Sequence, residues 1–507
     1  MIRAHSVAAV RAAERAEMEL LTSGVLMARA ATGVAAVGAR RLGSVYSSRV
    51  VVLAGSGDNG GDALYAGAWL ARRGARVDVL AAGDIHAGGW TALQRAGGRR
   101  WLAGGEGDPL LLGAADLVLD GLVGIGGRGA LREPAARLAR LAPPECTVAV
   151  DVPSGVDSDT GAVAGAAVRA AVTVTFGAYK RGLLIAPGAF HTGHVELIDI
   201  GISPHLGAPD LTALEAADAA RRLPSPGPED SKYTRGVVGV VAGSPAYTGA
   251  AVLSTGSAAL AGAGMVRFVS AAHPAEIVRN AHPEVVITVI DPGDSAALLA
   301  AGQVQAWVVG PGMGTDEGAA RLVAAVLGTD RPVLVDADAL TILSRDLGLV
   351  RGRRAPTLLT PHAGEFQRLT GVGAQELAAD RLGVVRATAA DLGVTVLLKG
   401  SRTLVVAPDG AARVNLTTSA KLATAGSGDV LSGACGAFLA AGLAPIDAGS
   451  LAAYLHGQAA CAAPAAMTAP DLLRFWAAAV RDILRSSGSF AEDAAKWPGA
   501  GPDAGAP

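Results

Sequence analysis

Cysteine is scarce in this chain of 507 residues, which contains only Cys146, Cys435 and Cys461. Three cysteines so far apart provide neither a disulfide framework nor a thiolate zinc site, and they fit a reducing compartment. The N-terminal stretch MIRAHSVAAVRAAERAEMELL has charges scattered along it and no apolar core segment, so we expect no signal peptide. These features together predict a cytoplasmic protein.

Lysine is also scarce, because only five of the 43 Lys and Arg residues are lysines. The formal net charge of −2 disfavours binding to nucleic acid through bulk electrostatics, so we expect small-molecule partners. A lysine ammonium is not interchangeable with an arginine guanidinium, so the few lysines of an arginine-rich chain are candidates for specific roles. They are Lys180, Lys232, Lys399, Lys421 and Lys496.

Two long uncharged stretches near the C-terminal end, 430–446 and 448–470, are rich in Ala and Gly and are interrupted by prolines. They predict core helices rather than membrane spans. Aromatic residues make up only 4% of the chain, but 50% of the residues are hydrophobic, which is enough for large cores. At about 150 residues per domain, the length suggests two to four domains. We expect a homo-oligomer that does not enter the membrane.

Prolines mark the clearest division of the chain, at 218–236, where Pro224, Pro226 and Pro228 occupy alternate positions. This spacing favours an extended, helix-free linker. On both sides of it, strand-like apolar runs alternate with Ala-rich helical runs, which predicts largely parallel sheets with helices on both faces. The strand-like runs are 49–55, 75–83, 115–124, 146–155 and 170–178 before the linker, and 235–244, 264–272, 284–291, 306–312, 332–338, 356–362, 394–400 and 403–410 after it.

We therefore predict an α/β protein with one domain at 1–217, a Pro-rich linker at 218–235 and a second domain at 228–487. Apolar spacing predicts helix in 5–42 and an amphipathic helix at 472–486. The remaining residues, 488–507, are predicted to be a disordered tail.

A glycine-rich loop, VVVLAGSGDNGGD, occupies 50–62. Gly55, Gly57 and Gly60 match the G-x-G-x-x-G dinucleotide fingerprint, and Asp78 follows at the distance of the ribose-binding acid. An enzyme of hydride transfer is therefore one interpretation. The crowded glycine, amide and carboxylate groups of this loop also suit close approach to a polar ligand and the binding of a cation through oxygen atoms.

Two further loops, at 120–130 and 151–157, combine an aspartate with glycines after a predicted strand. Ligands of open α/β sheets bind at the carboxyl ends of strands, where such loops supply both charge and backbone N–H groups. Either loop alone is also explained as a tight turn capped by aspartate. Three such loops in one sheet favour a binding site.

The motifs G-x-G-D-N-G-G-D, D-G-L-V-G-x-G, D-V-P-S-G-V-D and Y-K-R-G, spread over about residues 5–215, resemble the YjeF N-terminal domain, the NAD(P)H-hydrate epimerase. The resemblance implies a Rossmann-like three-layer sandwich that interconverts the R and S forms of hydrated NADH and NADPH. The residues that it implies contact the hydrated dinucleotide are Asp58, Asn59, Gly60, Gly61, Asp62, Gly124, Ile125, Gly126, Gly127, Arg128, Gly129, Ala130 and Asp151.

The same resemblance implies a K⁺ site formed by Asn59, Asp120 and Ser154, whose hard oxygen atoms suit this ion. Asp151 is our candidate for acid–base catalysis, with Lys180 as the charge partner that favours its ionised form.

The chain departs from the family's pattern at Asp58, Ala63 and Ile125, where the family usually has Asn, Gly and Thr. The pair His191 and His194 lacks further metal-ligating neighbours, so we interpret it as a turn before a strand rather than a zinc site.

In the second half, the loop from Gly426 to Asp429 directly precedes an apolar, Ala-rich helix. Backbone N–H groups at such a helix start form an anion site for phosphate, and the carboxylate of Asp429 can accept a proton from an attacking hydroxyl. Glycines and polar residues also follow the preceding predicted strands, so we expect them to lie together at one edge of the sheet. They are Gly310, Gly312, Gly314, Asp336, Asp338, Thr360, His362, Glu365 and Lys399.

With the segment from Lys232 to Ala250, these motifs resemble the ribokinase-like superfamily and, within it, the YjeF C-terminal domain, the ADP- or ATP-dependent NAD(P)H-hydrate dehydratase. The resemblance covers about 228–485 and implies a ribokinase-like three-layer sandwich. It implies transfer of a phosphoryl group to the hydrate, with Asp429 as the base and ADP as co-substrate. The implied hydrate contacts are Ala250, Gly312, Gly314, His362 and Asp429, and the implied nucleotide contacts are Lys399, Gly400, Ser401, Arg402, Thr403 and Gly428.

Mg²⁺ is expected with the nucleotide phosphates, and Asp336 or Asp338 is a candidate ligand. The favoured interpretation is thus a fused epimerase and dehydratase that repairs hydrated nicotinamide nucleotides. One alternative is a ribokinase-like kinase for a vitamin precursor, fused to a non-catalytic ligand-binding domain. Another is a nucleotide-sensing module with a silent N-terminal half.

Overall fold

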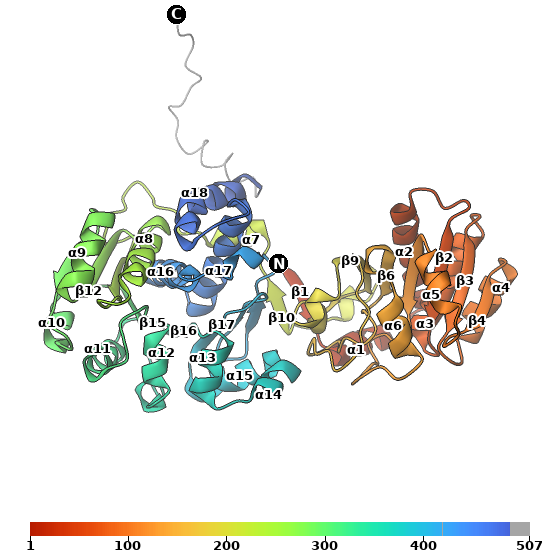
Figure 1. Ribbon diagram of the computed structural model, residues 1–507, viewed down its shortest axis with the longest axis horizontal. Coiled ribbons are helices and arrows are strands. Elements are labelled where there is room, and N and C mark those ends of the chain that lie inside the picture. Colours follow the sequence, from red (N-terminus) through yellow and green to blue (C-terminus); the bar gives the residue numbers. More distant parts are fainter. Residues whose placement is uncertain (418, 487–507) are drawn as a thin grey trace, which may run out of the picture. The chain divides into compact units, whose positions relative to one another are not determined.

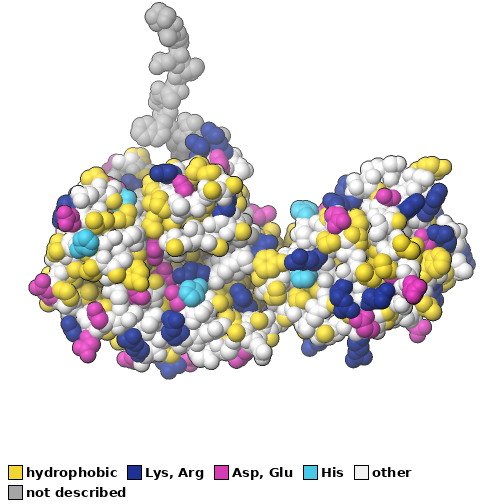
Figure 2. Space-filling view, viewed as in Figure 1, with side chains coloured by type: hydrophobic (Ala, Val, Ile, Leu, Met, Phe, Trp, Pro, Cys, Tyr) yellow, Lys and Arg dark blue, Asp and Glu magenta, His cyan; other side chains and the backbone are white. Residues whose placement is uncertain are grey.

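The computed structural model describes residues 1–417 and 419–486 (Figure 1). The predicted tail at 488–507, which includes Lys496, lies outside the described residues. Within them, no helix is both long and apolar enough to cross a membrane. Figure 2 shows basic and acidic side chains interspersed on the face in view, with no broad area of one sign.

The chain divides into two compact units. The N-terminal unit consists of residues 3–211 and 375–382, and the C-terminal unit consists of 1–2, 212–374 and the residues from 383 onward. Both units are built from strands that alternate with helices, so the predicted two-domain α/β architecture is confirmed.

The N-terminal unit contains a parallel sheet with the strand order β4-β3-β2-β5-β6-β7-β9. A second, short parallel pair joins β1 to β8. The chain runs from β2 outward to β4 and then returns to β5, so the order reverses between β2 and β5. The strands are β1 (Ile2–His5), β2 (Arg49–Ala54), β3 (Arg76–Ala81), β4 (Arg99–Leu102), β5 (Leu117–Gly121), β6 (Thr147–Val150), β7 (Val172–Phe176), β8 (Tyr179–Lys180) and β9 (His194–Ile198).

Helices cover both faces of this sheet. Successive side chains of each strand point to opposite faces, so apolar residues of one strand contact both helix layers. Val50 and Val52 of β2 enter one core with α2 and α3, while Val51 and Leu53 enter a second core with α5 and α6. The helices are α1 (Val7–Met18), α2 (Val25–Leu42), α3 (Asp58–Ala71), α4 (Ala87–Arg95), α5 (Asp108–Gly113) and α6 (Ala135–Leu141).

The C-terminal unit has the strand order β13-β12-β11-β14-β15-β16-β17-β18-β19-β10. Strands from β13 to β17 are parallel, β18 is antiparallel to both its neighbours, and the order reverses between β11 and β14. The strands are β10 (Leu211–Ala213), β11 (Val237–Val241), β12 (Met265–Ser270), β13 (Val286–Val289), β14 (Ala306–Val309), β15 (Val333–Val335), β16 (Thr357–Leu359), β17 (Thr395–Leu398), β18 (Leu404–Val406) and β19 (Ala412–Val414).

Helices α8, α16 and α17 pack on one face of this sheet, and α11, α12 and α13 lie on the other (Figure 1). The predicted core helices are confirmed as α16 and α17, which are almost entirely buried. The helices are α7 (Ala216–Arg222), α8 (Thr248–Leu260), α9 (Ala272–Ala281), α10 (Ser295–Leu299), α11 (Glu317–Leu327), α12 (Asp338–Leu343), α13 (Ala363–Thr370), α14 (Ala374–Ala379), α15 (Arg381–Leu392), α16 (Ser427–Ala440), α17 (Pro445–Ala462) and α18 (Ala469–Ser486).

Two predictions about local structure are wrong in part. The stretch 218–236 is not free of helix, because α7 continues to Arg222. Glu215 and Asp218 form a capping box at the start of α7. The prediction of a helix-free linker gave weight to the downstream prolines and none to this local helix-start signal. The N-terminal segment is not helical throughout either, since α1 ends at Met18 and α2 begins at Val25.

Candidate functional sites at the two strand-order reversals

The glycine loop after β2 lies at the first reversal, where open α/β sheets bind ligands. A side chain at Gly55 would place its Cβ 1.9 Å from the carbonyl oxygen of Leu122, which follows β5. A Cβ at Gly60 would lie 2.2 Å from the carbonyl oxygen of Gly55. These glycines therefore let the loop close tightly against its neighbour, and Ser56 beside Gly55 forms part of the floor of a cavity.

Two cavities meet at this floor, and Ser56, Leu122, Val123 and Gly124 line both of them. The larger cavity has a volume of about 1050 Å³ and the smaller one about 600 Å³. Of the predicted dinucleotide contacts, the larger cavity exposes Asp58, Asn59, Asp62, Gly124, Ile125, Gly126 and Asp151, and the smaller one exposes Gly127, Arg128, Gly129 and Ala130.

Gly60 and Gly61 line neither cavity. Both are buried in the first turn of α3, where a Cβ at Gly61 would lie 3.0 Å from the ring of His86. Their role in this structure is therefore close packing of the loop.

Asp78 does not reach the cavities either. Its carboxylate accepts hydrogen bonds from Arg99 at 2.8 Å and from the Trp101 indole at 2.9 Å. The residue that completed the dinucleotide fingerprint is thus engaged elsewhere on the sheet, which disfavours the interpretation as an enzyme of hydride transfer.

Asp151 and Lys180 form a buried ion pair beside the larger cavity. The Lys180 side chain is completely buried, and its Nζ donates to Asp151 Oδ1 at 2.5 Å, to Thr175 Oγ1 at 3.0 Å and to the Phe176 carbonyl at 2.9 Å. Asp151 reaches the cavity wall, whereas Lys180 lies behind it, so Lys180 acts through Asp151. Asp151 also has a φ of 65°, a left-handed conformation that costs a non-glycine residue about 1–2 kcal/mol.

Two of the further carboxyl groups at the same cavity have raised pKa values. Burial, with the charges of Asp151 and Asp58, holds the pKa of Asp62 well above its usual range, and Asp62 Oδ1 is buried without a hydrogen-bond partner. Burial also raises the pKa of Glu14, which α1 brings to the cavity. Glu14 was not predicted from the sequence, because a single glutamate in an Ala-rich helix carries no signal of its own.

The residues predicted to bind K⁺ gather under the loop after β5. Ser154 donates to Asp120 from its hydroxyl at 2.7 Å and from its backbone at 2.9 Å, and a Cβ at Gly124 would lie 3.0 Å from Asn59 Oδ1. Asp120 is fully buried, and burial raises its pKa to about 6 despite these hydrogen bonds. A buried carboxylate with hydroxyl and amide oxygens nearby fits a monovalent cation, which would offset the buried charge.

The histidines at 191 and 194 lie in a turn and at the start of the strand that follows it. His191 Nδ1 contacts the Val168 carbonyl at 2.9 Å, and His194 begins β9. Among the described residues, no group of three or more His, Cys, Asp and Glu side chains is arranged to hold a metal ion.

The second site lies at the start of α16. Gly426 precedes this helix with a φ of 86°, and the first turn carries Gly428 and Asp429. Burial, together with the charge of Asp336, raises the pKa of Asp429 to about 7, although Lys399 opposes the shift. A carboxyl group that changes charge near neutral pH beside unpaired helix N–H groups can take a proton from a hydroxyl that attacks a phosphate.

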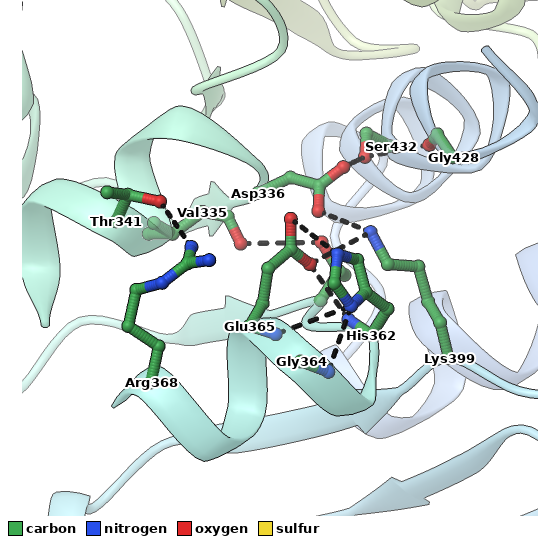
Figure 3. Close-up of polar contacts among 11 residues, drawn as sticks. Val335, Asp336, Thr341, His362, Gly364, Glu365, Arg368, Lys399, Gly428 and Ser432 are labelled. Atoms are coloured by element: carbon green, nitrogen blue, oxygen red, sulfur yellow. Dashed lines mark hydrogen bonds and ion pairs between the residues drawn. The ribbon is translucent and has the colours of Figure 1, made fainter. Parts of the chain in front are cut away.

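Lys399, Asp336 and Ser432 form a network behind this loop (Figure 3). Lys399 Nζ lies 2.7 Å from Asp336 Oδ1, and Ser432 donates to Asp336 Oδ2 at 2.5 Å. Burial works against the charged form of Lys399, but the carboxylates of Asp336 and Glu365 outweigh it and raise the pKa of Lys399. Ser432 was not singled out in the sequence, where it is one of several small residues in the helix.

His362 caps α13 at the same edge. Its Nδ1 accepts hydrogen bonds from the backbone of Gly364 at 3.0 Å and of Glu365 at 3.3 Å, while Glu365 Oε2 accepts from the His362 backbone at 2.8 Å. Nδ1 is thereby occupied, so in the neutral ring the proton lies on Nε2. With 58% of its side chain exposed, His362 remains free to contact a ligand.

The other predicted hydrate contacts lie at the second reversal. A Cβ at Gly312 would lie 2.9 Å from the Ala250 Cβ, so the structure brings these two residues together. Gly314 donates its backbone N–H to Asp338 Oδ2 at 2.9 Å.

The predicted nucleotide segment forms the turn between β17 and β18. Within it, Thr403 donates to the Gly400 carbonyl at 3.1 Å, and Arg402 donates to the Leu416 carbonyl at 2.6 Å. Ser401 is exposed in the same turn.

Asp336 does not fit a Mg²⁺ ligand, because protein donors occupy both of its carboxylate oxygens. Asp338 has only one oxygen engaged. The described residues thus offer little for this ion, and a divalent cation at this site would be held chiefly by the phosphates of the nucleotide.

Comparison with known proteins finds matches along most of the chain. A family model described as NAD(P)H-hydrate dehydratase matches residues 238–475, and one described as YjeF-related protein N-terminus matches residues 23–182. The chain is 48% identical over 447 residues to the bifunctional NAD(P)H-hydrate repair enzyme Nnr of Mycobacterium tuberculosis, covering 87% of this chain and 89% of that protein. It is 47% identical to the enzyme of the same name from Mycobacterium leprae, covering 90% and 93% of the two chains.

Among solved structures, a ribokinase-like superfamily protein from Enterococcus faecalis matches with a TM-score of 0.50 and 23% identity. The match covers 55% of this chain and 98% of that protein. It confirms the ribokinase-like fold predicted for the second domain.

Proposed function

The chain belongs to the family of bifunctional NAD(P)H-hydrate repair enzymes, and we propose on this basis that its two units carry out two successive reactions. The N-terminal unit epimerises the R and S forms of hydrated NADH and NADPH. The C-terminal unit dehydrates the S form at the expense of a nucleotide. The observation that carries the second activity is Asp429, whose pKa of about 7 coincides with a helix start suited to phosphate.

In the dehydration, the C6 hydroxyl of the hydrate attacks the terminal phosphorus of the nucleotide while Asp429 accepts its proton. The bond between phosphorus and the bridging oxygen breaks, and AMP leaves when ADP is the donor. The phosphorylated hydrate then loses phosphate, which takes the electron pair of the C6–O bond, and loss of the C5 proton restores the double bond. Backbone N–H groups of α16 and the ammonium of Lys399 stabilise the charge on the phosphates.

In the epimerisation, Asp151 is the proposed acid–base catalyst at the hydrate, and Lys180 holds its carboxylate in place. Asn59, Asp120 and Ser154 would hold K⁺, which supplies positive charge near the bound dinucleotide. The larger cavity takes the hydrated nicotinamide, because it contains Asp151, and the smaller one takes the rest of the dinucleotide.

We further propose ADP as the preferred nucleotide, with Lys399 to Thr403 and Gly428 as its contacts. A cytoplasmic location and a homo-oligomeric state also stay predictions. Parallel assays with ADP and ATP test the nucleotide preference, and light scattering of the purified chain tests the oligomeric state.

The deciding experiment follows the near-ultraviolet absorbance of the reduced nicotinamide after enzyme and ADP are added to mixed R and S hydrates. Full recovery supports both activities. Recovery that stops at the S fraction, after correction for spontaneous epimerisation, would contradict the epimerase. Absence of recovery with either nucleotide would contradict the dehydratase, and ATP-dependent phosphorylation of a small alcohol instead would favour a vitamin-precursor kinase.

A further inference from the structure

Asp336 lies directly behind the loop from Gly426 to Asp429, although no step of the proposed reaction uses it. We propose that Asp336 is a positioning residue for phosphoryl transfer, which holds the ammonium of Lys399 against the start of α16. This inference rests on the dehydratase activity proposed for the C-terminal unit.

Three elements converge on the Asp336 carboxylate (Figure 3). Asp336 follows β15, Lys399 follows β17, and β16 pairs in parallel with both strands. The carboxyl ends of these strands therefore bring the two residues to one edge of the sheet. Ser432 comes from the second turn of α16, where its hydroxyl also contacts the Gly428 carbonyl at 3.0 Å.

Asp336 has no oxygen left for a substrate. Lys399 occupies Oδ1 at 2.7 Å, Ser432 occupies Oδ2 at 2.5 Å, and only 2% of the Asp336 side chain is exposed. Its side-chain contacts therefore reach the reaction site only through these two neighbours. Ser432 links the carboxylate to the helix, and Lys399 carries the charge that a phosphate would meet.

The ammonium of Lys399 lies close to the proposed phosphate site. A Cβ added at Gly428 would be 3.5 Å from Lys399 Nζ. Glu365 Oε2 lies 3.6 Å from Nζ and comes from α13, a different element. With Asp336 neutral, Glu365 would be the nearest remaining carboxylate, and the ammonium would be drawn away from α16.

A purely structural ion pair is the alternative, but it is poorly suited to this place. Burial, and after it the charge of Asp336, raises the pKa of Asp429, so Asp336 disfavours ionisation of the proposed base. Apolar side chains would join β15 to α16 without this disadvantage. A carboxylate at this position is explained if holding Lys399 in place speeds phosphoryl transfer by more than the weaker ionisation of Asp429 slows it.

The test uses full-length chains with D336N, with K399M and with both, after the wild type has been shown to recover cofactor. We expect D336N to lower kcat for dehydration about tenfold, with the KM for the hydrate changed by less than about twofold. K399M should lower kcat at least as much, and the double variant should be no slower than K399M, because both changes remove the same ammonium contact. Epimerisation should stay unchanged in all three.

Asp447→Asn is the matched control, because Asp447 pairs with Arg222 at 2.8 Å and with Arg413 at 2.6 Å, away from the loop. It should lower thermal stability and leave kcat unchanged. A D336N chain that behaves in the same way would overturn the inference. So would effects of D336N and K399M that multiply in the double variant.

Ser432→Ala keeps the test decisive if D336N does not fold, because it leaves the Asp336 carboxylate in place and removes only the contacts of the Ser432 hydroxyl, with Asp336 Oδ2 at 2.5 Å and with the Gly428 carbonyl at 3.0 Å. We expect kcat to fall about threefold, and the effect to vanish in the K399M background. An unchanged kcat would overturn the inference. A wild type inactive with both ADP and ATP would overturn the proposed function together with it, whereas an active wild type matched by both variants would overturn the inference alone.

Discussion

The scarce lysines separate into distinct environments. Lys180 and Lys399 each pair with an aspartate, one in each unit; Lys180 is fully buried, whereas 19% of the Lys399 side chain is exposed. Lys421 donates to the Ala463 carbonyl at 2.6 Å and so caps the end of α17, while Lys232 is exposed beside Tyr233. The role suggested by their rarity is therefore supported at two positions, where the ammonium pairs with an aspartate.

We expect Lys180→Arg to lower epimerisation, and Lys399→Arg to lower dehydration, each by about tenfold or more. The larger guanidinium overpacks a buried site and shifts the paired carboxylate. Lys232→Arg is the control and should leave both activities unchanged. The two reactions are measured separately in each full-length variant. Equal loss of both activities in Lys180→Arg or in Lys399→Arg would indicate general misfolding instead.

Asp429 should give dehydration its pH dependence. Since burial and Asp336 raise the pKa of Asp429 to about 7, the base is largely protonated below that pH. We therefore expect kcat/KM for the hydrate to fall about tenfold per pH unit well below 7 and to level off above it. An acid limb near the ordinary value of an aspartate would show that Asp429 is not the base.

The same residue should make the C-terminal unit less stable at high pH. Its folded pKa lies above the unfolded value, so the folded state binds the extra proton, and this contribution to stability is lost as the pH rises through about 7. We expect D429N to gain about 2 kcal/mol relative to the wild type between pH 5 and pH 8. Urea denaturation at both pH values measures this, and a constant difference would contradict it. Dehydration should be abolished in D429N.

At the scale of elements, α16 is placed by its glycines. A Cβ at Gly433 would lie 2.1 Å from the Ser254 carbonyl oxygen on α8. We expect Gly433→Ala to destabilise the C-terminal unit by about 1–3 kcal/mol, because the helices cannot separate without disturbing the core. Gly249→Ala is the matched control in a helix with open space around it, and it should be neutral or slightly stabilising. Urea denaturation compares them, and equal stability of the two variants would contradict this account.

The elements that the sequence predicted best are those that bury continuous apolar runs. All five strands predicted before the linker exist, as do the eight after it, because each consists of apolar residues bounded by turn residues. The sequence did not predict β4, whose residues Arg99 to Leu102 are exposed at the sheet edge, or the short strands β1, β8, β10 and β19. Exposed or very short strands lack the periodic burial that makes a strand recognisable.

Asn59 and Asp151 were singled out because they follow predicted strands, and the structure places both at the larger cavity. Asp429 was singled out because its glycine loop precedes an apolar helix, and it lies in the first turn of α16. Glu14 and Ser432 were not singled out, because each is a single polar residue among the small residues of a helix. The ion pair between Asp336 and Lys399 was not predicted either, since 63 residues separate the two along the chain.

At the scale of the whole molecule, the two units use the same device for different chemistry. Each holds a lysine against a buried aspartate that directly follows a parallel strand. Each also has a non-glycine residue with positive φ at that strand end, Asp151 in one and Ala337 in the other. In the N-terminal unit the paired aspartate reaches the cavity itself, whereas in the C-terminal unit it lies behind the residue proposed to act.

Because each site is built from residues of one unit, the two reactions should be separable and should complement one another between chains. We expect D151N to recover cofactor only from the S hydrate, and D429N to recover none. A mixture of the two variants should restore full recovery from mixed hydrates, since the S hydrate made by the D429N chain can diffuse to the D151N chain. The absorbance assay measures the extent of recovery, with the D151N, D429N double variant as the inactive control and the rate of spontaneous epimerisation subtracted. Recovery by the mixture no greater than that of D151N alone would mean that the hydrate does not pass between chains, and the two sites would then have to act within one molecule.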